Sequence, residues 1–110
     1  MSIELSPTDV QVIIDDEEGL SSLCFRWGDI GGYLCIARDP DEEGVYCEYC
    51  DQSNGFYSKT ICLGLFGDYI EFKLGGDESF SQTERIPVLV VRMKIQDEEV
   101  KKCIELLFAS

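Results

Sequence analysis

The alternation of apolar and polar residues predicts a chain built mainly of short β-strands. Alternation over about four to eight residues, or a short apolar run between turn residues, is typical of a strand. The segments with such a pattern are 10–14, 23–27, 33–37, 45–51, 57–66, 69–74 and 88–95. We therefore expect about six to seven strands.

Turn residues separate these segments. Gly28-Asp29-Ile30-Gly31-Gly32 supplies residues that tolerate positive φ, which predicts a hairpin between 23–27 and 33–37. Asn54-Gly55 is a second turn signal. Pro87 favours an edge position for the strand that it begins, because proline cannot donate a backbone hydrogen bond.

The C-terminal segment changes to a helical period. Asp97 is placed to cap a helix, and acids follow it in the first turn, where the helix dipole favours them. Four apolar residues then recur on one helical face. They are Val100, Cys103, Ile104 and Leu107.

Consecutive strands with short turns and one terminal helix predict an α+β fold in a single domain, residues 1–110. We expect a meander-like antiparallel β-sheet of about six to seven strands, with the C-terminal α-helix packed on one face. The face of strand 88–95 that should meet the helix carries Leu89, Val91, Met93 and Ile95.

The charge of the chain restricts its partners. It has 22 acidic and nine basic residues, a net charge of -13, so it should repel nucleic acids and anionic membranes. Residues 1–50 hold 12 acids and two basic residues, whereas residues 51–110 hold ten acids and seven basic residues. Concentrated charge of one sign steers an oppositely charged partner, although acids in loops also serve solubility alone.

The residue types present argue against an enzyme. The chain has no histidine, which removes histidine-dependent nucleophilic catalysis and histidine-ligated metals. Its glycines do not fit a dinucleotide or phosphate-binding loop. We expect no catalysis and no cofactor. The first residues lack the basic start and apolar run of a secretory signal, so we expect a cytoplasmic protein.

The six cysteines are expected to be thiols. Cys24, Cys35, Cys62 and Cys103 adjoin apolar residues, where free cysteine acts as a small hydrophobe, and a reducing cytosol disfavours disulfides. The Cys47-Glu48-Tyr49-Cys50 motif is flanked by strand-like residues, which would place its two thiols on opposite faces. A small metal-binding protein that uses this pair remains an alternative.

Two neighbouring segments supply candidate contacts for a partner. The loop Asp39-Pro40-Asp41-Glu42-Glu43-Gly44 resembles the start of a calcium loop, but Cys50 occupies the position that a bidentate glutamate would need. In the strand that follows, Tyr46, Glu48 and Cys50 should share one face. Tyrosine beside acids is a good interface anchor.

The stretch Gly44-Val45-Tyr46-Cys47-Glu48-Tyr49-Cys50-Asp51-Gln52-Ser53-Asn54-Gly55 precedes two strands, a polar loop, Ile86-Pro87-Val88 and a final helix. This arrangement resembles the tenth family of immunity proteins from bacterial polymorphic toxin systems. Glu48, Asp51 and Gln52 occupy the family's Glu-x-x-Asp-Gln pattern. The resemblance covers residues 44–108, and the chain departs from the family in its cysteines and in loop 75–85.

The resemblance implies a small acidic α+β antidote that binds and neutralises a cognate toxin domain in the cytoplasm. An acidic surface suits a cationic toxin, of which a basic nuclease is one class. The alternative is a self-associating or adaptor protein, with strand 88–95 pairing at the edge of a homodimer. Asp51 and Gln52 would also suit a structural role as caps of the turn. The candidate partner-binding residues are Asp39, Asp41, Glu42, Glu43, Tyr46, Glu48, Asp51 and Gln52.

Overall fold

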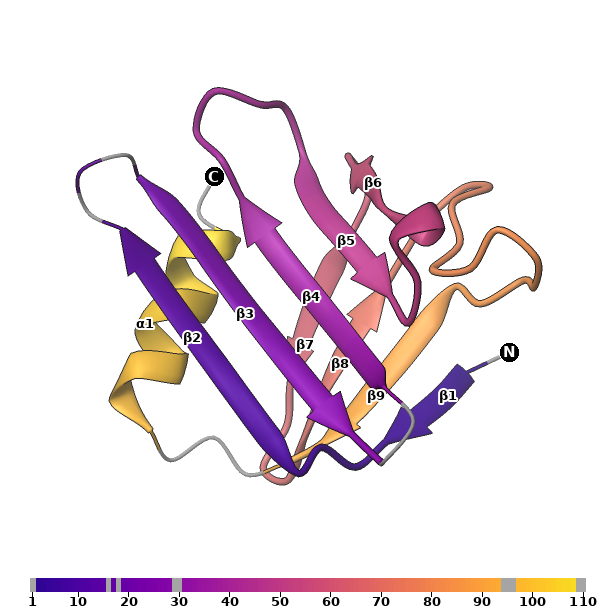
Figure 1. Ribbon diagram of the computed structural model, residues 1–110, viewed down its shortest axis with the longest axis horizontal. Helices are drawn as coiled ribbons and strands as arrows, with labels where there is room; N and C mark the ends of the chain where they lie inside the picture. The colour runs from indigo at the N-terminus through magenta and orange to yellow at the C-terminus, as the bar shows by residue number, and fades with distance from the viewer. Residues whose placement is uncertain (1, 16, 18, 29–30, 94–96, 109–110) are drawn as a thin grey trace.

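The computed structural model describes residues 2–15, 17, 19–28, 31–93 and 97–108 (Figure 1). The strands are β1 (Ser2–Leu5), β2 (Asp9–Asp15), β3 (Leu20–Trp27), β4 (Gly32–Arg38), β5 (Val45–Tyr49), β6 (Phe56–Ser58), β7 (Cys62–Leu65), β8 (Tyr69–Lys73) and β9 (Val88–Arg92). A short 3-10 helix, η1 (Gln52–Asn54), follows β5, and one α-helix, α1 (Glu98–Leu107), ends the described chain. The expected α+β class is confirmed.

The strands divide into two sheets. Strands β2-β3-β4-β5-β6 form a five-stranded antiparallel meander. The expected hairpin is present, because β3 pairs with β4 and the connection uses positive φ at Gly28 and Gly31. The second sheet has four strands in the order β1-β9-β8-β7, with β1 parallel to β9. The meander expected from the sequence is therefore confined to residues 9–58.

The division into two sheets arises where segment 57–66 was expected to be one strand. It forms two strands, β6 and β7, each in a different sheet. Between them the Ser58 hydroxyl accepts hydrogen bonds from the backbone N–H groups of Thr60 (3.2 Å) and Ile61 (3.0 Å). A serine that bonds the backbone two and three residues ahead favours a turn over an extended chain.

Strand β9 lies inside its sheet, between β1 and β8. The alternative in which this strand pairs across a homodimer required it to lie at an edge, and that condition is not met, because its ladder positions on both sides are used within the chain. The reason is β1, a strand of only four residues at the N-terminus. Its residues Ser2-Ile3-Glu4-Leu5 alternate over the shortest length typical of a strand and were not among the expected strands, yet they cover the edge that Pro87 suggested.

Helix α1 has the expected cap and buried face. The Asp97 carboxylate accepts a hydrogen bond from the Glu99 N–H at 2.9 Å, and the predicted apolar residues are all buried. The helix packs against β2, β3 and β4. Cys103 Sγ, for example, donates to the Ser22 carbonyl oxygen at 3.3 Å. These contacts position the helix, and not the packing on the apolar face of strand 88–95 that was expected from the sequence. Ile95 of that expected face lies outside the described residues.

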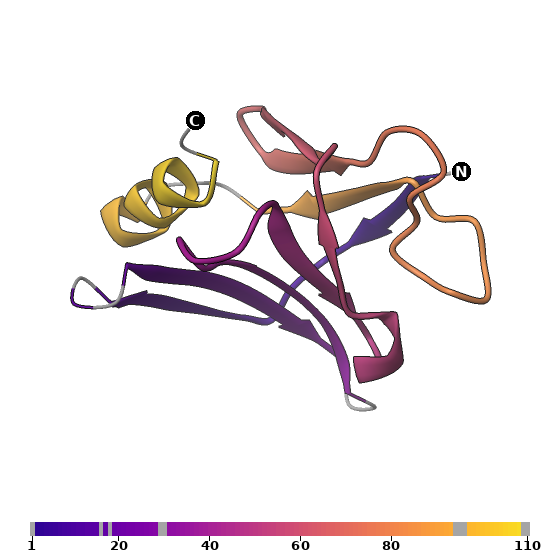
Figure 2. The same cartoon turned by 90° about the horizontal axis from the view of Figure 1, so that it is seen from above.

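Figure 2 shows that α1 and the four-stranded sheet lie side by side on one face of the five-stranded sheet. The side chains between these layers form a single apolar core. Phe25 of β3 and Phe72 of β8 join the two sheets, with ring centroids 6.1 Å apart. Leu89 and Val91 of β9 are fully buried in the same core. Among the described residues, no element covers the opposite face of the five-stranded sheet in either view.

Candidate functional site

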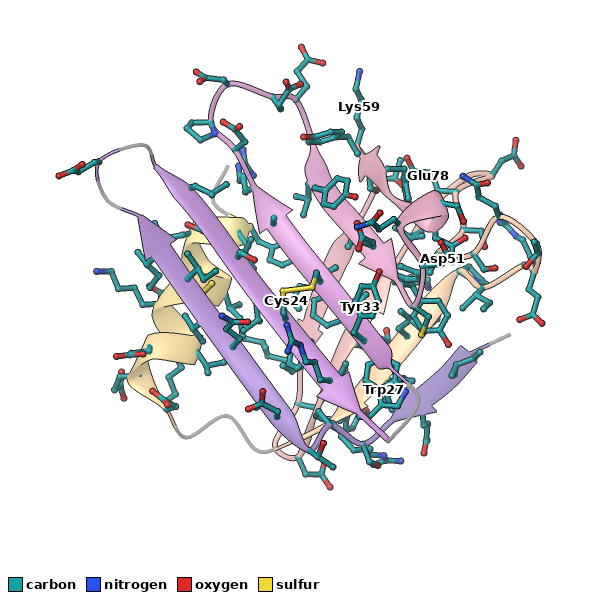
Figure 3. All side chains as sticks on the ribbon, in the orientation of Figure 1. Cys24, Trp27, Tyr33, Asp51, Lys59 and Glu78 are labelled. Carbon is teal, nitrogen blue, oxygen red and sulfur yellow. A yellow bond between two sulfur atoms is a disulfide. The ribbon has the colours of Figure 1, made fainter. Side chains whose placement is uncertain are left out.

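We call that uncovered surface the outer face. Strand register and the alternation of buried residues place its side chains. The described members are Asp9, Gln11, Ile13, Leu20, Ser22, Cys24, Arg26, Tyr33, Cys35, Ala37, Tyr46, Glu48 and Tyr57. The face therefore combines tyrosines, sulfur and a few charged groups. Figure 3 views it from the front, with Tyr33 and Cys24 labelled.

Glu48 is the centre of a hydrogen-bond network on the outer face. Tyr33 Oη donates a hydrogen bond to Glu48 Oε2 at 2.6 Å, and Tyr46 Oη donates one to Glu48 Oε1 at 2.5 Å. Tyr33 comes from β4 and the other two residues from β5, so the network spans two strands. The expectation that Tyr46 and Glu48 share a face is confirmed, since Val45 and Cys47 are buried on the other side.

The two hydrogen bonds leave part of the Glu48 carboxylate available. An ionised carboxylate has about four acceptor sites, so each oxygen keeps one site beyond its tyrosine. Within the described residues Glu48 makes no ion pair. The structure thus presents a carboxylate that is fixed in orientation and can still accept further hydrogen bonds. Two parallel acceptor sites on one carboxylate match the planar fork of a guanidinium group.

Gly55 and Tyr57 lie next to the Tyr46 side chain. A β-carbon at Gly55 would collide with the Tyr46 hydroxyl, so glycine at this position makes room for the hydroxyl beside Glu48. The Tyr57 ring packs against Tyr46 with centroids 5.3 Å apart, and 47% of the residue is exposed. The glycine after the Asn54 turn therefore supports the Tyr46–Glu48 contact as well as the turn.

Both tyrosines retain their protons over a wide pH range. Burial, followed by the hydrogen bond to Glu48, raises the pKa of Tyr33 above its usual value. The hydrogen bond to Glu48 is the main cause that raises the pKa of Tyr46 to about 12, and burial adds to it. Each hydroxyl therefore stays a hydrogen-bond donor near neutral pH.

The raised pKa of Tyr46 predicts a loss of stability in alkali. A group whose pKa is higher in the folded state contributes stability that is complete below its unfolded pKa and is lost as the pH rises through its folded pKa. For Tyr46 this window runs from pH 10 to about pH 12. We expect the urea midpoint to fall less across this window in Tyr46→Phe than in the wild type. Equal falls would contradict the Tyr46–Glu48 hydrogen bond.

A surface cavity of about 560 Å³ adjoins Glu48 at the turn between β3 and β4. Its size lies within the range of about 300–1,000 Å³ that is usual for binding pockets. The Trp27 side chain packs close to Gly32, where a β-carbon would collide with the indole ring. The cavity is lined by Arg26, Trp27, Gly28, Gly31, Gly32, Tyr33, Cys35, Glu48 and Gln52. Its lining thus combines aromatic rings with one carboxylate and one guanidinium group.

The predicted partner-binding residues fall into separate groups. The acids of loop 39–44 lie between β4 and β5, at the end of β5 opposite to η1 (Figure 3). Glu43 forms an exposed ion pair with Lys59 at 3.1 Å, and the Asp39 carboxylate accepts from the Asp41 N–H at 2.9 Å. Asp41 and Glu42 are exposed. Glu48 and Gln52 line the cavity, and Tyr46 is hydrogen-bonded to Glu48. Asp39 and Tyr46 line a separate, smaller cavity of about 150 Å³.

Asp51 has a structural contact. Its Oδ1 accepts a hydrogen bond from the Ser53 N–H at 2.9 Å, which caps η1. That bond is the main cause that lowers the pKa of Asp51. The capping role considered for Asp51 is therefore observed, whereas Gln52 lines the cavity beside Glu48. The two adjacent residues of the family-like motif thus differ in what they touch.

The expectation of free core thiols is wrong for Cys24 and Cys35. They lie directly opposite each other on β3 and β4, are partly exposed, and form a disulfide. Each cysteine sits between residues that point to the core, so strand alternation turns its own side chain outward. An apolar run does not say which residues of a strand face the core.

The other four cysteines are free. Cys103 is buried, as expected, but Cys62 is exposed on an edge strand, which corrects the core assignment. Cys47 is buried and Cys50 is exposed. The strand expected for 45–51 ends at Tyr49, and Cys50 follows it with a positive φ of 60°, so the alternation that was to place Cys50 on the face of Tyr46 and Glu48, opposite Cys47, does not reach it. Among the described residues, no group of three or more potential ligands could hold a metal ion.

No protein-family model, no curated protein and no solved structure matches this chain. The outer face is therefore the basis on which function can be inferred. Within the described parts of the chain, no helix is both long and apolar enough to cross a membrane.

Three outer-face residues that line the cavity were not among the sequence candidates. They are Arg26, Tyr33 and Cys35, and Tyr33 is the one that completes the Glu48 network. The available signal was the hairpin expected for 23–27 and 33–37, which already placed Tyr33 next to its turn. Its contact with Glu48 also requires the register between β4 and β5, which pairs Cys35 with Glu48. Alternation within one strand cannot supply that register.

Proposed function

We propose that this protein is a non-enzymatic antidote, an immunity protein that binds and neutralises a cognate cationic toxin domain in the cytoplasm. The observation that supports this most is the Glu48 carboxylate, which two tyrosine hydroxyls hold on an uncovered sheet face. The resemblance of residues 44–108 to immunity proteins adds to it. Neutralisation needs no catalytic group on this chain, because occupation of the toxin's own site is sufficient.

The anchor of the complex is an arginine or lysine of the toxin at Glu48. A guanidinium would use the remaining acceptor site on each carboxylate oxygen and stack on neighbouring aromatic rings. Tyr33, Tyr57 and Trp27 provide such rings around Glu48 and the cavity. Tyrosine and tryptophan also dominate the energetic centres of protein interfaces, since they bury a large area at a small entropic cost.

The charge asymmetry of the sequence coincides with the sheet that carries this anchor. Residues 9–58, which build the five-stranded sheet, contain 12 acids and two basic residues, a net charge of -10. A toxin that acts on nucleic acid needs a cationic cleft to hold phosphates. The acids concentrated in this span, four of them in loop 39–44, are the electrostatic complement of such a cleft, so a basic nuclease is the class of toxin that we propose.

The acidic loop is expected to affect the rate of association. Neutralising it with Asp39→Asn, Asp41→Asn, Glu42→Gln and Glu43→Gln should lower the association rate by about tenfold and flatten its salt dependence. The matched control is the removal of four exposed acids elsewhere. It consists of Asp68→Asn, Asp77→Asn, Glu84→Gln and Glu105→Gln. Stopped-flow mixing with the captured partner measures both, and equal effects would show that the loop has no steering role of its own.

The function is tested by affinity capture from a lysate of the source organism, with tagged wild type and Glu48→Gln compared at low and high salt. We expect the wild type to retain one basic toxin domain at low salt, and salt or the substitution to release it. Co-expression of the wild type should then restore growth to cells that produce that domain. Equal capture by both baits, or failure to restore growth, would contradict the proposal.

A further inference from the structure

The Cys24–Cys35 disulfide lies in the middle of the outer face, as the yellow bond in Figure 3 shows. The two residues occupy directly opposite positions of β3 and β4, and their Cα atoms are 4.2 Å apart. On both sides of this position, the neighbouring cross-strand pairs bury their side chains in the core. These pairs are Leu23 with Ile36 and Phe25 with Leu34.

The core therefore holds the two strands together whether or not the sulfur atoms are joined. The bond closes a loop between residues only 11 apart in sequence, within a hairpin that already has seven paired positions. A short loop is the case in which a cross-link adds least to chain ordering. We therefore expect this disulfide to add little to the stability of the fold.

Its surroundings connect it to the candidate site. In the cross-strand row of the sheet, Cys24 lies next to Gln11, and Cys35 lies next to Glu48. Cys35 lines the same cavity as Glu48 and Trp27. Both sulfur residues are partly exposed on a face that no element covers, so small thiols and disulfides in solution can reach them.

We propose that Cys24 and Cys35 are a reversible thiol–disulfide modification site that exchanges with small-molecule disulfides of the glutathione class. In the oxidising direction, the Cys24 and Cys35 thiols lose their protons and one S–S bond forms between the sulfurs. The S–S bond of glutathione disulfide breaks, and its two sulfurs take up the two electrons and two protons as two thiols. The exchange passes through a mixed disulfide. Accessible disulfides are the ones that undergo such exchange readily.

This inference goes beyond the proposed function and does not depend on it, because the exchange needs no toxin. In a reducing compartment the pair is a dithiol, and an oxidising shift converts it to the disulfide. The cavity beside Glu48 then exists in two chemical forms. The fluorescence of Trp27 should distinguish the two forms, because Trp27 lines the cavity and is the single tryptophan of the chain.

The test equilibrates the full-length protein in glutathione buffers that run from fully reduced to fully oxidised. Samples are quenched, unfolded and alkylated, and mass spectrometry counts the free thiols. We expect six free thiols at the reduced end and four at the oxidised end, with peptide mapping placing the change at Cys24 and Cys35. Trp27 fluorescence should change with the same midpoint, while circular dichroism shows a folded protein at both ends.

Two variants control the measurement. Cys50→Ser with Cys62→Ser removes the exposed free thiols and should leave the transition unchanged. Cys24→Ser with Cys35→Ser should abolish it and give constant Trp27 emission. Six free thiols in every buffer would overturn the proposal, because no disulfide would form. Four free thiols in every buffer, with reduction only after unfolding, would also overturn it and identify a fixed structural bond.

Discussion

Replacing Glu48 with glutamine is expected to weaken binding of the cognate toxin by about 2–4 kcal/mol, or roughly 30- to 1,000-fold. Glutamine keeps the size of the side chain and one carbonyl acceptor, so the fold should be retained. It removes the charge and one of the two acceptor sites that a guanidinium fork needs. The partner's cation would then be buried without a counter-charge, and most of the loss should appear as faster dissociation.

Titration calorimetry of wild type and Glu48→Gln against the captured partner measures this effect. Glu71→Gln is the matched control, because Glu71 is also partly buried and lies in β8 of the other sheet. We expect Glu71→Gln to change the affinity by less than about threefold, as is usual for residues outside an interface's energetic centre. If Glu48→Gln bound the partner with an affinity as close to that of the wild type as the control variant does, Glu48 would not be the anchor of the complex.

Replacing Phe25 with alanine is expected to lower the free energy of unfolding by about 3–5 kcal/mol. Phe25 is fully buried, and the centroid of its ring lies 6.1 Å from that of Phe72 in the other sheet. Truncation of Phe25 therefore opens a cavity between the two layers. Phe66 provides a matched comparison, because 46% of it is exposed while it stacks on Tyr69. Phe66→Ala should cost only about 1 kcal/mol.

Urea unfolding measures both variants. A loss for Phe25→Ala as small as that for Phe66→Ala would contradict the packing of the two sheets on one core. Phe25→Ala also separates folding from binding, because its effect on partner capture should follow the folded fraction, whereas Glu48→Gln should lose the partner while fully folded.

Local sequence patterns were sufficient for much of the fold. The strand at 33–37 was predictable as a short apolar run after a turn, and the helix beginning after Asp97 because its apolar residues recur on one face. The division of segment 57–66 into two strands was not, because the turn depends on hydrogen bonds from the backbone to the Ser58 hydroxyl, which alternation does not register. Strand β1 alternates over only four residues and was not expected, and without it the edge of β9 could not be judged.

The candidate site was predictable only within one strand. The shared face of Tyr46 and Glu48 follows from alternation along β5, and the structure confirms it. Tyr33 joins them through a register between strands, which depends on packing across the sheet. The register between β3 and β4 likewise places Cys24 opposite Cys35, whose apolar neighbours had indicated the core. Contacts between strands were therefore missed where contacts within a strand were found.

The most direct test of binding through the outer face is tyrosine footprinting of the protein with and without the captured toxin, read by mass spectrometry. Tyr46 and Tyr57 lie on the outer face, while Tyr69 lies on β8 of the other sheet and provides an internal control. We predict that the toxin protects Tyr46 and Tyr57 from labelling and leaves Tyr69 unchanged. Protection of Tyr69 with continued labelling of Tyr46 and Tyr57 would contradict binding at the outer face.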